Sequence, residues 1–123
     1  MSRPVIFDTD AGTDVDDLYA LALILAHPEL DLLGVTTCDG DTAARARLVT
    51  KMLRLAGRED VPVFAGPRCP LRLAGTPGGG DYQQKLTHCQ LVETGDPESD
   101  AEYGDAVEFV LETLGAAERP VTI

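Results

Sequence analysis

The sequence has few cysteines and few basic residues, and each shortage argues against a class of protein. Its three cysteines, Cys38, Cys69 and Cys89, form no CxxC pair, and an odd count argues against a disulfide framework. Only 10 Lys and Arg accompany 21 Asp and Glu, so the formal net charge is −11, which repels phosphate backbones and anionic lipid. We therefore expect free thiols, no nucleic-acid partner and no membrane-surface partner.

Long hydrophobic runs are also absent. The longest apolar stretch, Leu18 to Ala26, is shorter than the roughly 18 residues that a membrane span needs, and two aspartates precede it instead of a basic segment. We expect neither a transmembrane helix nor a signal peptide, and therefore a cytoplasmic protein. The 123 residues, 44% of them hydrophobic and 25% charged, suit one domain with a packed core.

Apolar, β-branched segments alternate with helix-forming segments in the first half of the chain. The pattern predicts strands at 4–7, 32–37 and 61–65, and helices at about 16–26 and 43–56. This β-α-β-α-β order predicts a parallel α/β sheet with right-handed crossovers.

The second predicted helix has two distinct faces. We expect its apolar face to be buried, with Leu48, Met52 and Leu55 upon it. The basic residues Arg47, Lys51, Arg54 and Arg58 are expected to form a solvated surface.

The second half of the chain is less regular. A glycine- and proline-rich segment from Gly66 to Gln84 predicts a long loop, and an acidic run from Glu93 to Asp105 leads into a helix that ends near Leu114. The last five residues, 119–123, are typical of a strand that has only begun. Because a parallel sheet needs both faces covered, we expect a Rossmann-like open parallel sheet with helices on both faces, truncated, with residues 1–123 as the N-terminal part of a single α/β domain.

Aspartates gather where the first predicted strand meets the first predicted helix. Five lie within ten residues, namely Asp8, Asp10, Asp14, Asp16 and Asp17. Asp39 and Asp41 follow the second strand and lie close by if the two strands are neighbours, and ligands of open parallel sheets bind at such strand ends. Asp8 and Asp10 share a face if the strand stays regular.

Converging carboxylates repel one another unless a cation or a shared proton lies between them. All the candidate ligands are oxygens, with no His or Cys among them, which favours Ca²⁺ or Mg²⁺ over zinc or copper. The structural alternative is that Asp14, Asp16 or Asp17 caps the helix and that Asp8 and Asp10 form a turn.

The segment DTDAGTDVDDLYAL, residues 8–21, resembles the opening motif of the inosine-uridine nucleoside hydrolase family. VTTCDGD at 35–41 and VPVFAGPRCPL at 61–71 resemble the second and third strands of that family and the turns that follow them. The resemblance implies a calcium-dependent hydrolase that cleaves the N-glycosidic bond of a small-molecule nucleoside, and family members commonly form homo-oligomers.

The resemblance also implies roles for individual aspartates. Asp10 is the base that takes the proton of a metal-bound water. Asp10 and Asp17 are metal ligands, with Asp8 as a supporting carboxylate beside them. Asp16 contacts the ribose hydroxyls. Asp14 is the alternative for this role, because the chain has two more residues between Gly12 and the pair Asp16 and Asp17 than the shortest family pattern. Asp41 orients the sugar or the water.

Two other classes share part of this pattern. A haloacid-dehalogenase-like, Mg²⁺-dependent phosphatase also begins with an apolar strand and a D-x-D, but it has no role for the pair Asp16 and Asp17. A non-enzymatic receiver-type signalling domain also has an acidic Mg²⁺ pocket, but it needs an aspartate at the end of the third strand, where this chain has Ala65.

Overall fold

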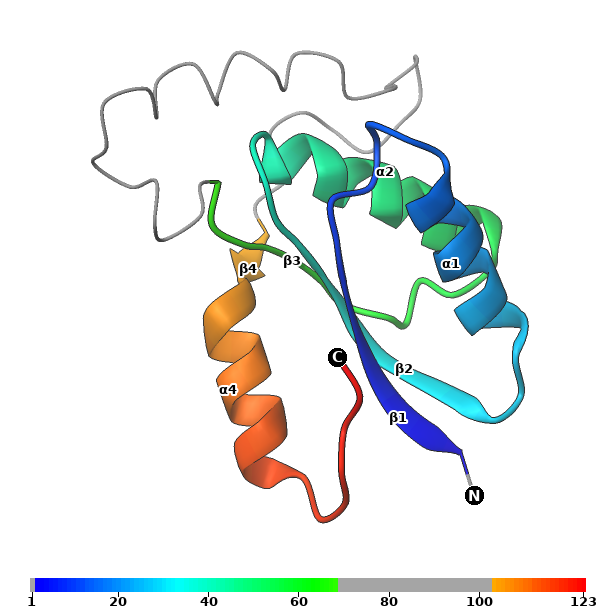
Figure 1. Cartoon of the computed structure of the whole chain (residues 1–123), viewed down its shortest axis with the longest axis vertical. Helices are drawn as coiled ribbons and strands as arrows, with labels where there is room; N and C mark the ends of the chain where they lie inside the picture. Colours follow the sequence, from blue (N-terminus) through cyan, green and yellow to red (C-terminus); the bar gives the residue numbers. More distant parts are fainter. Residues whose placement is uncertain (1, 69–102) are drawn as a thin grey trace.

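In the computed structural model, residues 2–68 and 103–123 are described, and they form a parallel sheet with helices on both faces (Figure 1). The sheet contains β1 (Arg3–Thr9), β2 (Leu30–Thr37), β3 (Val63–Ala65) and β4 (Gly104–Asp105) in that spatial order. The helices are α1 (Asp16–Ala26), α2 (Thr42–Leu55) and α4 (Ala106–Ala116). The predicted fold class is confirmed. Cys69, Cys89, most of the loop predicted from Gly66 to Gln84 and the acidic run up to residue 102 lie outside the described residues.

The order of the strands reverses at β1. The chain runs from β1 through β2 and β3 to β4 at the far edge of the sheet. It then returns, and Thr122 forms a parallel bridge with Val5 at the edge of β1 opposite β2. The segment expected to begin a further strand therefore does pair with the sheet. Because right-handed crossovers in opposite directions lie on opposite faces, α1 and α2 cover one face and α4 covers the other (Figure 1).

The main core lies between β2 and the pair α1 and α2. Leu21 of α1 and Val49 and Leu53 of α2 pack with Leu32 and Val35 of β2, and all five are at most 5% exposed. This burial, summed over the cluster, is the main favourable contribution to folding.

The buried face of α2 differs from the predicted one. Leu55 is 78% exposed, whereas Arg45, Val49 and Leu53 are each at most 2% exposed. These three residues are four apart and form one stripe along the helix. The predicted apolar face was wrong for Leu55, whereas Met52 is half-buried against the core. Arg45, which the prediction placed on neither face, faces inward.

Helix α4 packs on the opposite face through one aromatic side chain. The ring of Phe109 stacks on Phe64 of β3 with centroids 4.2 Å apart, and it lies over Gly34 of β2, where an added Cβ would be 2.5 Å from Phe109 Cζ. The helix begins at Asp105, whose carboxylate accepts a hydrogen bond from the amide of Glu108 at 2.9 Å. Within the described ranges, no helix is long and apolar enough to cross a membrane.

Candidate functional site

The loop after β1 is fixed by a buried threonine. Thr9 is 2% exposed; its hydroxyl donates a hydrogen bond to Asp17 Oδ1 at 2.7 Å and accepts one from the amide of Ala11 at 3.0 Å. Gly12 then adopts a φ of +115°, a conformation that glycine adopts without strain. Thr9 thus connects the end of β1 to the first turn of α1 and orients the carboxylate of Asp17.

Asp10 and Asp17 are brought together by this loop. Partial burial raises the pKa of the Asp10 carboxyl, the negative charge of Asp17 raises it further, and a hydrogen bond between the two side chains acts in the same direction. Arg45 and the backbone lower it in part. The two carboxylates therefore repel each other electrostatically, and a cation between them would relieve that repulsion.

The alternative that these aspartates merely cap α1 is wrong. The N-cap residue is Val15, and no side chain forms a hydrogen bond at this cap. Asp16 and Asp17 lie in the first turn, and Asp14 is exposed in the loop before it. The side chain of Asp17 instead accepts the hydrogen bond from Thr9.

Asp8 does not share a regular strand with Asp10. The predicted common face required a regular strand through Asp10, but β1 ends at Thr9. The Asp8 carboxylate accepts a hydrogen bond from the hydroxyl of its cross-strand neighbour Thr36 at 2.6 Å. Asp8 therefore lies on the β2 side of the site, whereas Asp10 turns toward α1.

The loop after β2 lies beside the loop after β1, as expected for neighbouring strands. Asp41 is the N-cap of α2, and its Oδ1 accepts a hydrogen bond from the amide of Ala44 at 3.0 Å. Asp39 adopts a left-handed φ of +69°. Asp41 therefore has a structural role at the helix start in addition to the sugar contact predicted for it.

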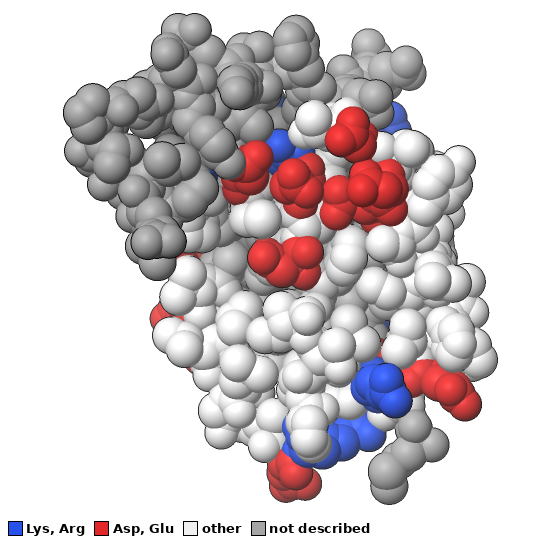
Figure 2. All heavy atoms as spheres, viewed as in Figure 1, with Lys and Arg blue, Asp and Glu red and all other residues white. Residues whose placement is uncertain are grey.

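The half-buried thiol of Cys38 shows how closely the carboxylates converge. Burial raises the pKa of the Cys38 thiol to about 11, and the negative charges of Asp8, Asp10 and Asp39 contribute to the increase. Figure 2 shows acidic side chains gathered at the end of the molecule where β1 and β2 terminate. This edge of the sheet is strongly negative.

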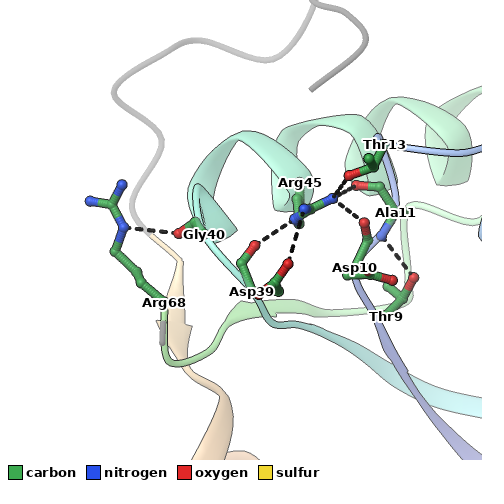
Figure 3. A network of polar contacts seen from close by, with 8 residues as sticks. All are labelled: Thr9, Asp10, Ala11, Thr13, Asp39, Gly40, Arg45 and Arg68. Carbon is green, nitrogen blue, oxygen red and sulfur yellow. Dashed lines mark hydrogen bonds and ion pairs between the residues drawn. The ribbon is translucent and has the colours of Figure 1, made fainter. Parts of the chain in front are cut away.

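A buried arginine, absent from the predicted site, joins the two loops (Figure 3). Arg45 of α2 donates hydrogen bonds to the carbonyl oxygens of Asp10, Ala11 and Asp39 and to the hydroxyl of Thr13. One feature of the sequence could have indicated that Arg45 is buried. It lies four residues before Val49 and eight before Leu53, on the side of α2 that is buried.

The acidic site fits a hard cation in part. Asp10 and Asp17 provide adjacent oxygen ligands of the type that Ca²⁺ prefers. In the ranges 2–68 and 103–123, however, no three His, Cys, Asp or Glu side chains come close enough to enclose a metal ion. The described residues thus do not enclose a metal ion by themselves, and metal binding by Asp8, Asp10 and Asp17 stays a prediction.

Acidic side chains gather at the carboxyl end of β1, where the strand order reverses. This is the topological switch point, where α/β proteins with open parallel sheets bind their ligands. The chain belongs to the inosine-uridine preferring nucleoside hydrolase family, whose sequence profile matches residues 5–123. This membership confirms the resemblance of the sequence motifs. It also excludes the phosphatase and receiver-domain alternatives.

Relatives of known sequence and structure agree with this assignment. The chain is 37% identical over 112 residues to an uncharacterized protein of Schizosaccharomyces pombe, covering 89% of this chain and 35% of that protein. It is 35% identical over 134 aligned positions to the pyrimidine-specific ribonucleoside hydrolase RihA of Shewanella sp. strain MR-4, covering all of this chain and 38% of that enzyme.

Two solved structures share the fold. A plant nucleoside hydrolase, PpNRh1, superposes with a TM-score of 0.63 at 29% identity, over 94% of this chain and 36% of that one. The purine-preferring ribonucleoside hydrolase of Gardnerella vaginalis also gives a TM-score of 0.63, at 25% identity, over 97% of this chain and 38% of that one. The chain thus spans little more than a third of the length of these relatives.

Proposed function

We propose that Asp10 and Asp17 belong to a calcium-dependent active site that hydrolyses the N-glycosidic bond of ribonucleosides. The observation on which this proposal rests is that Thr9, at the carboxyl end of β1, bonds both to the Asp17 carboxylate and to the loop that contains Asp10, in a chain of the nucleoside hydrolase family. The names of the relatives include both a pyrimidine-specific and a purine-preferring enzyme. The proposal therefore specifies the sugar and the bond, with either kind of base as substrate.

Asp10 is the proposed general base. Its carboxylate is exposed just beyond the end of β1, where it can accept a proton from a water. It takes the proton of the attacking water as the oxygen approaches the anomeric carbon of the ribose. The bond from that carbon to the base nitrogen breaks, and the base leaves with the bonding electron pair and takes a proton from solvent. A bound calcium ion supplies positive charge that holds the ribose hydroxyls and makes a nearby water more acidic.

The other aspartates hold the sugar and the ion. Asp17, oriented by Thr9, is the second proposed calcium ligand, and Asp8 is a supporting carboxylate. Asp16 is exposed in the first turn of α1 and accepts hydrogen bonds from the ribose hydroxyls, while Asp41 orients the sugar from the β2 side. Their negative charge stabilises the oxocarbenium-like transition state of glycoside cleavage.

The test is release of ribose, measured as reducing sugar, from purine and pyrimidine ribonucleosides at millimolar calcium. Asp10→Asn removes the base but keeps the size of the side chain, so we expect the rate to fall by about 10²- to 10⁴-fold. Asp60→Asn makes the same change of charge at an exposed turn residue and is expected to leave the rate unchanged.

A chelator should abolish release by the wild-type chain. Equal rates for the wild-type chain and Asp10→Asn would rule out Asp10 as the base. An absence of ribose release from every nucleoside by the wild-type chain would contradict activity of this chain.

A further inference from the structure

Among the described residues, Arg45 is the most deeply buried charged side chain near the acidic edge. It is 2% exposed, although arginine is rarely buried without several partners. Its guanidinium lies between the loop after β1 and the loop after β2 (Figure 3). The position is not explained by helix stability, because Arg45 points away from solvent toward these loops.

Arg45 contacts both loops at once. On the β1 side, Nη1 donates to the carbonyl oxygen of Asp10, to that of Ala11 at 3.0 Å and to the hydroxyl of Thr13 at 3.0 Å. On the β2 side, Nε donates to the carbonyl oxygen of Asp39 at 2.7 Å, and Nη2 lies 3.7 Å from the Asp39 carboxylate. Nη1 carries two hydrogens, so one of them is shared between two of its three acceptors. The planar guanidinium thereby reaches both loops at once, whereas the single ammonium group of lysine cannot.

The Arg45 contacts connect the two loops beyond the point where the hydrogen bonds between β1 and β2 end. The β1–β2 ladder ends at the pair Thr9 and Thr37, and one further hydrogen bond joins the amide of Cys38 to the carbonyl of Thr9 at 3.0 Å. Beyond it, Asp39 adopts the left-handed φ of +69°, which is uncommon for a residue other than glycine. The Arg45 hydrogen bond to the carbonyl of Asp39 helps to hold that conformation.

We infer that Arg45 is a positioning residue that sets the spacing between the Asp10 loop and the Asp39–Asp41 loop. The inference rests on the proposed function, since Asp10 is the proposed base and Asp41 is proposed to orient the sugar. Arg45 acts through the two loops, mainly through hydrogen bonds to their backbone carbonyl oxygens. By fixing the carbonyl oxygens on both sides, it keeps the carboxylates of both loops arranged for one ribose.

Two substitutions separate position from charge. Arg45→Lys keeps the positive charge but loses the planar fork, and Arg45→Gln loses both. If Arg45 sets the loop spacing, both variants lower kcat by about 10- to 100-fold with a smaller change in KM, because a small misplacement of reacting groups is costly. If Arg45 only offsets negative charge, Arg45→Lys behaves as the wild type and Arg45→Gln binds calcium more tightly, which would overturn the inference.

Two control variants show whether lost stability or a lost surface charge is enough to lower kcat. Val49→Ala lowers stability from the same helix, since Val49 is fully buried in the core and is not among the polar contacts that join Arg45 to the two loops. Arg54→Gln removes an arginine whose side chain is 50% exposed. Both are expected to keep the wild-type kcat at temperatures well below their unfolding midpoints.

Amide hydrogen exchange gives a readout that is independent of activity. In the full chain, Arg45→Lys and Arg45→Gln should speed exchange at residues 11–13 and 38–41, whereas Val49→Ala should not do so selectively. Unchanged exchange in both loops would overturn the inference even if the enzyme is active. If the wild-type chain releases no ribose, the proposed activity fails, but the exchange data still decide whether Arg45 couples the loops.

Discussion

At the scale of the residue, Cys38 reports the electrostatic potential of the acidic edge. Because burial and the neighbouring carboxylates raise its thiol pKa from 9.0 to about 11, about a hundredfold less thiolate is present at pH 8 than in an ordinary cysteine. The more basic thiolate is more nucleophilic, which offsets part of this loss. We expect alkylation at pH 8 to be about tenfold slower than that of a small-molecule thiol.

The measurement uses iodoacetamide on a chain with Cys69 and Cys89 replaced by serine. Asp8→Asn, which removes the largest charge contribution, should speed alkylation, and Asp60→Asn should not. The raised pKa favours the neutral thiol in the folded state, so its contribution to stability is present below pH 9 and is lost as the pH rises toward 11. Alkylation as fast as that of a free thiol would contradict this account of the site.

At the scale of the element, the close packing of α4 on the sheet depends on a glycine. Gly34→Ala would place a Cβ 2.5 Å from the tip of Phe109, a ring that is already stacked on Phe64. We expect a loss of unfolding free energy of about 1–3 kcal/mol from overpacking. Urea denaturation monitored by circular dichroism measures it.

The matched control for Gly34→Ala is Gly115→Ala. Gly115 lies in the last turn of α4, and an added Cβ there meets no atom within 4 Å. Alanine at this position should be neutral or stabilise the chain by up to about 1 kcal/mol. Equal effects of the two substitutions would show that α4 does not pack on Gly34 as described.

The strands and helices of the first half of the chain were predictable from the sequence, because apolar segments, helix-forming residues and the glycines and prolines that end them indicated the same boundaries. The first helix was predicted at 16–26, and α1 is Asp16–Ala26. The face that α2 buries was not predictable from hydrophobicity alone. The polar contacts of Arg45 with two loops distant in the sequence help to decide which face lies inward. The strand β4 was also missed, because a two-residue strand depends on its neighbour β3 and leaves no periodic signal.

The candidate site was predictable at the level of its residue types. A cluster of aspartates at a strand end indicated the location, and the structure brings Asp10 and Asp17 close enough there for the charge of Asp17 to raise the pKa of the Asp10 carboxyl. Their partners were not predictable, because Thr9 and Arg45 become neighbours of the site only through the fold. Nothing in the local pattern indicated that Asp10 would leave the strand and pair with Asp17 rather than share a face with Asp8.

At the scale of the whole molecule, the charge distribution favours cation binding at one end. The chain has a formal net charge of −11, and acidic side chains concentrate where β1 and β2 terminate (Figure 2). Such a concentration destabilises the folded state through repulsion. A cation that binds there and not to the unfolded chain therefore stabilises the fold.

Titration of the chain with calcium by isothermal calorimetry, with Asp10→Asn, Asp17→Asn and Asp60→Asn in parallel, tests the central claim most directly. The account predicts saturable binding that is retained in Asp60→Asn and lost in the two site variants, because each of those removes one of the two adjacent carboxylates. Identical calcium binding by all four proteins, or none by the wild-type chain, would contradict the assignment of Asp10 and Asp17 as the calcium ligands of a nucleoside hydrolase site.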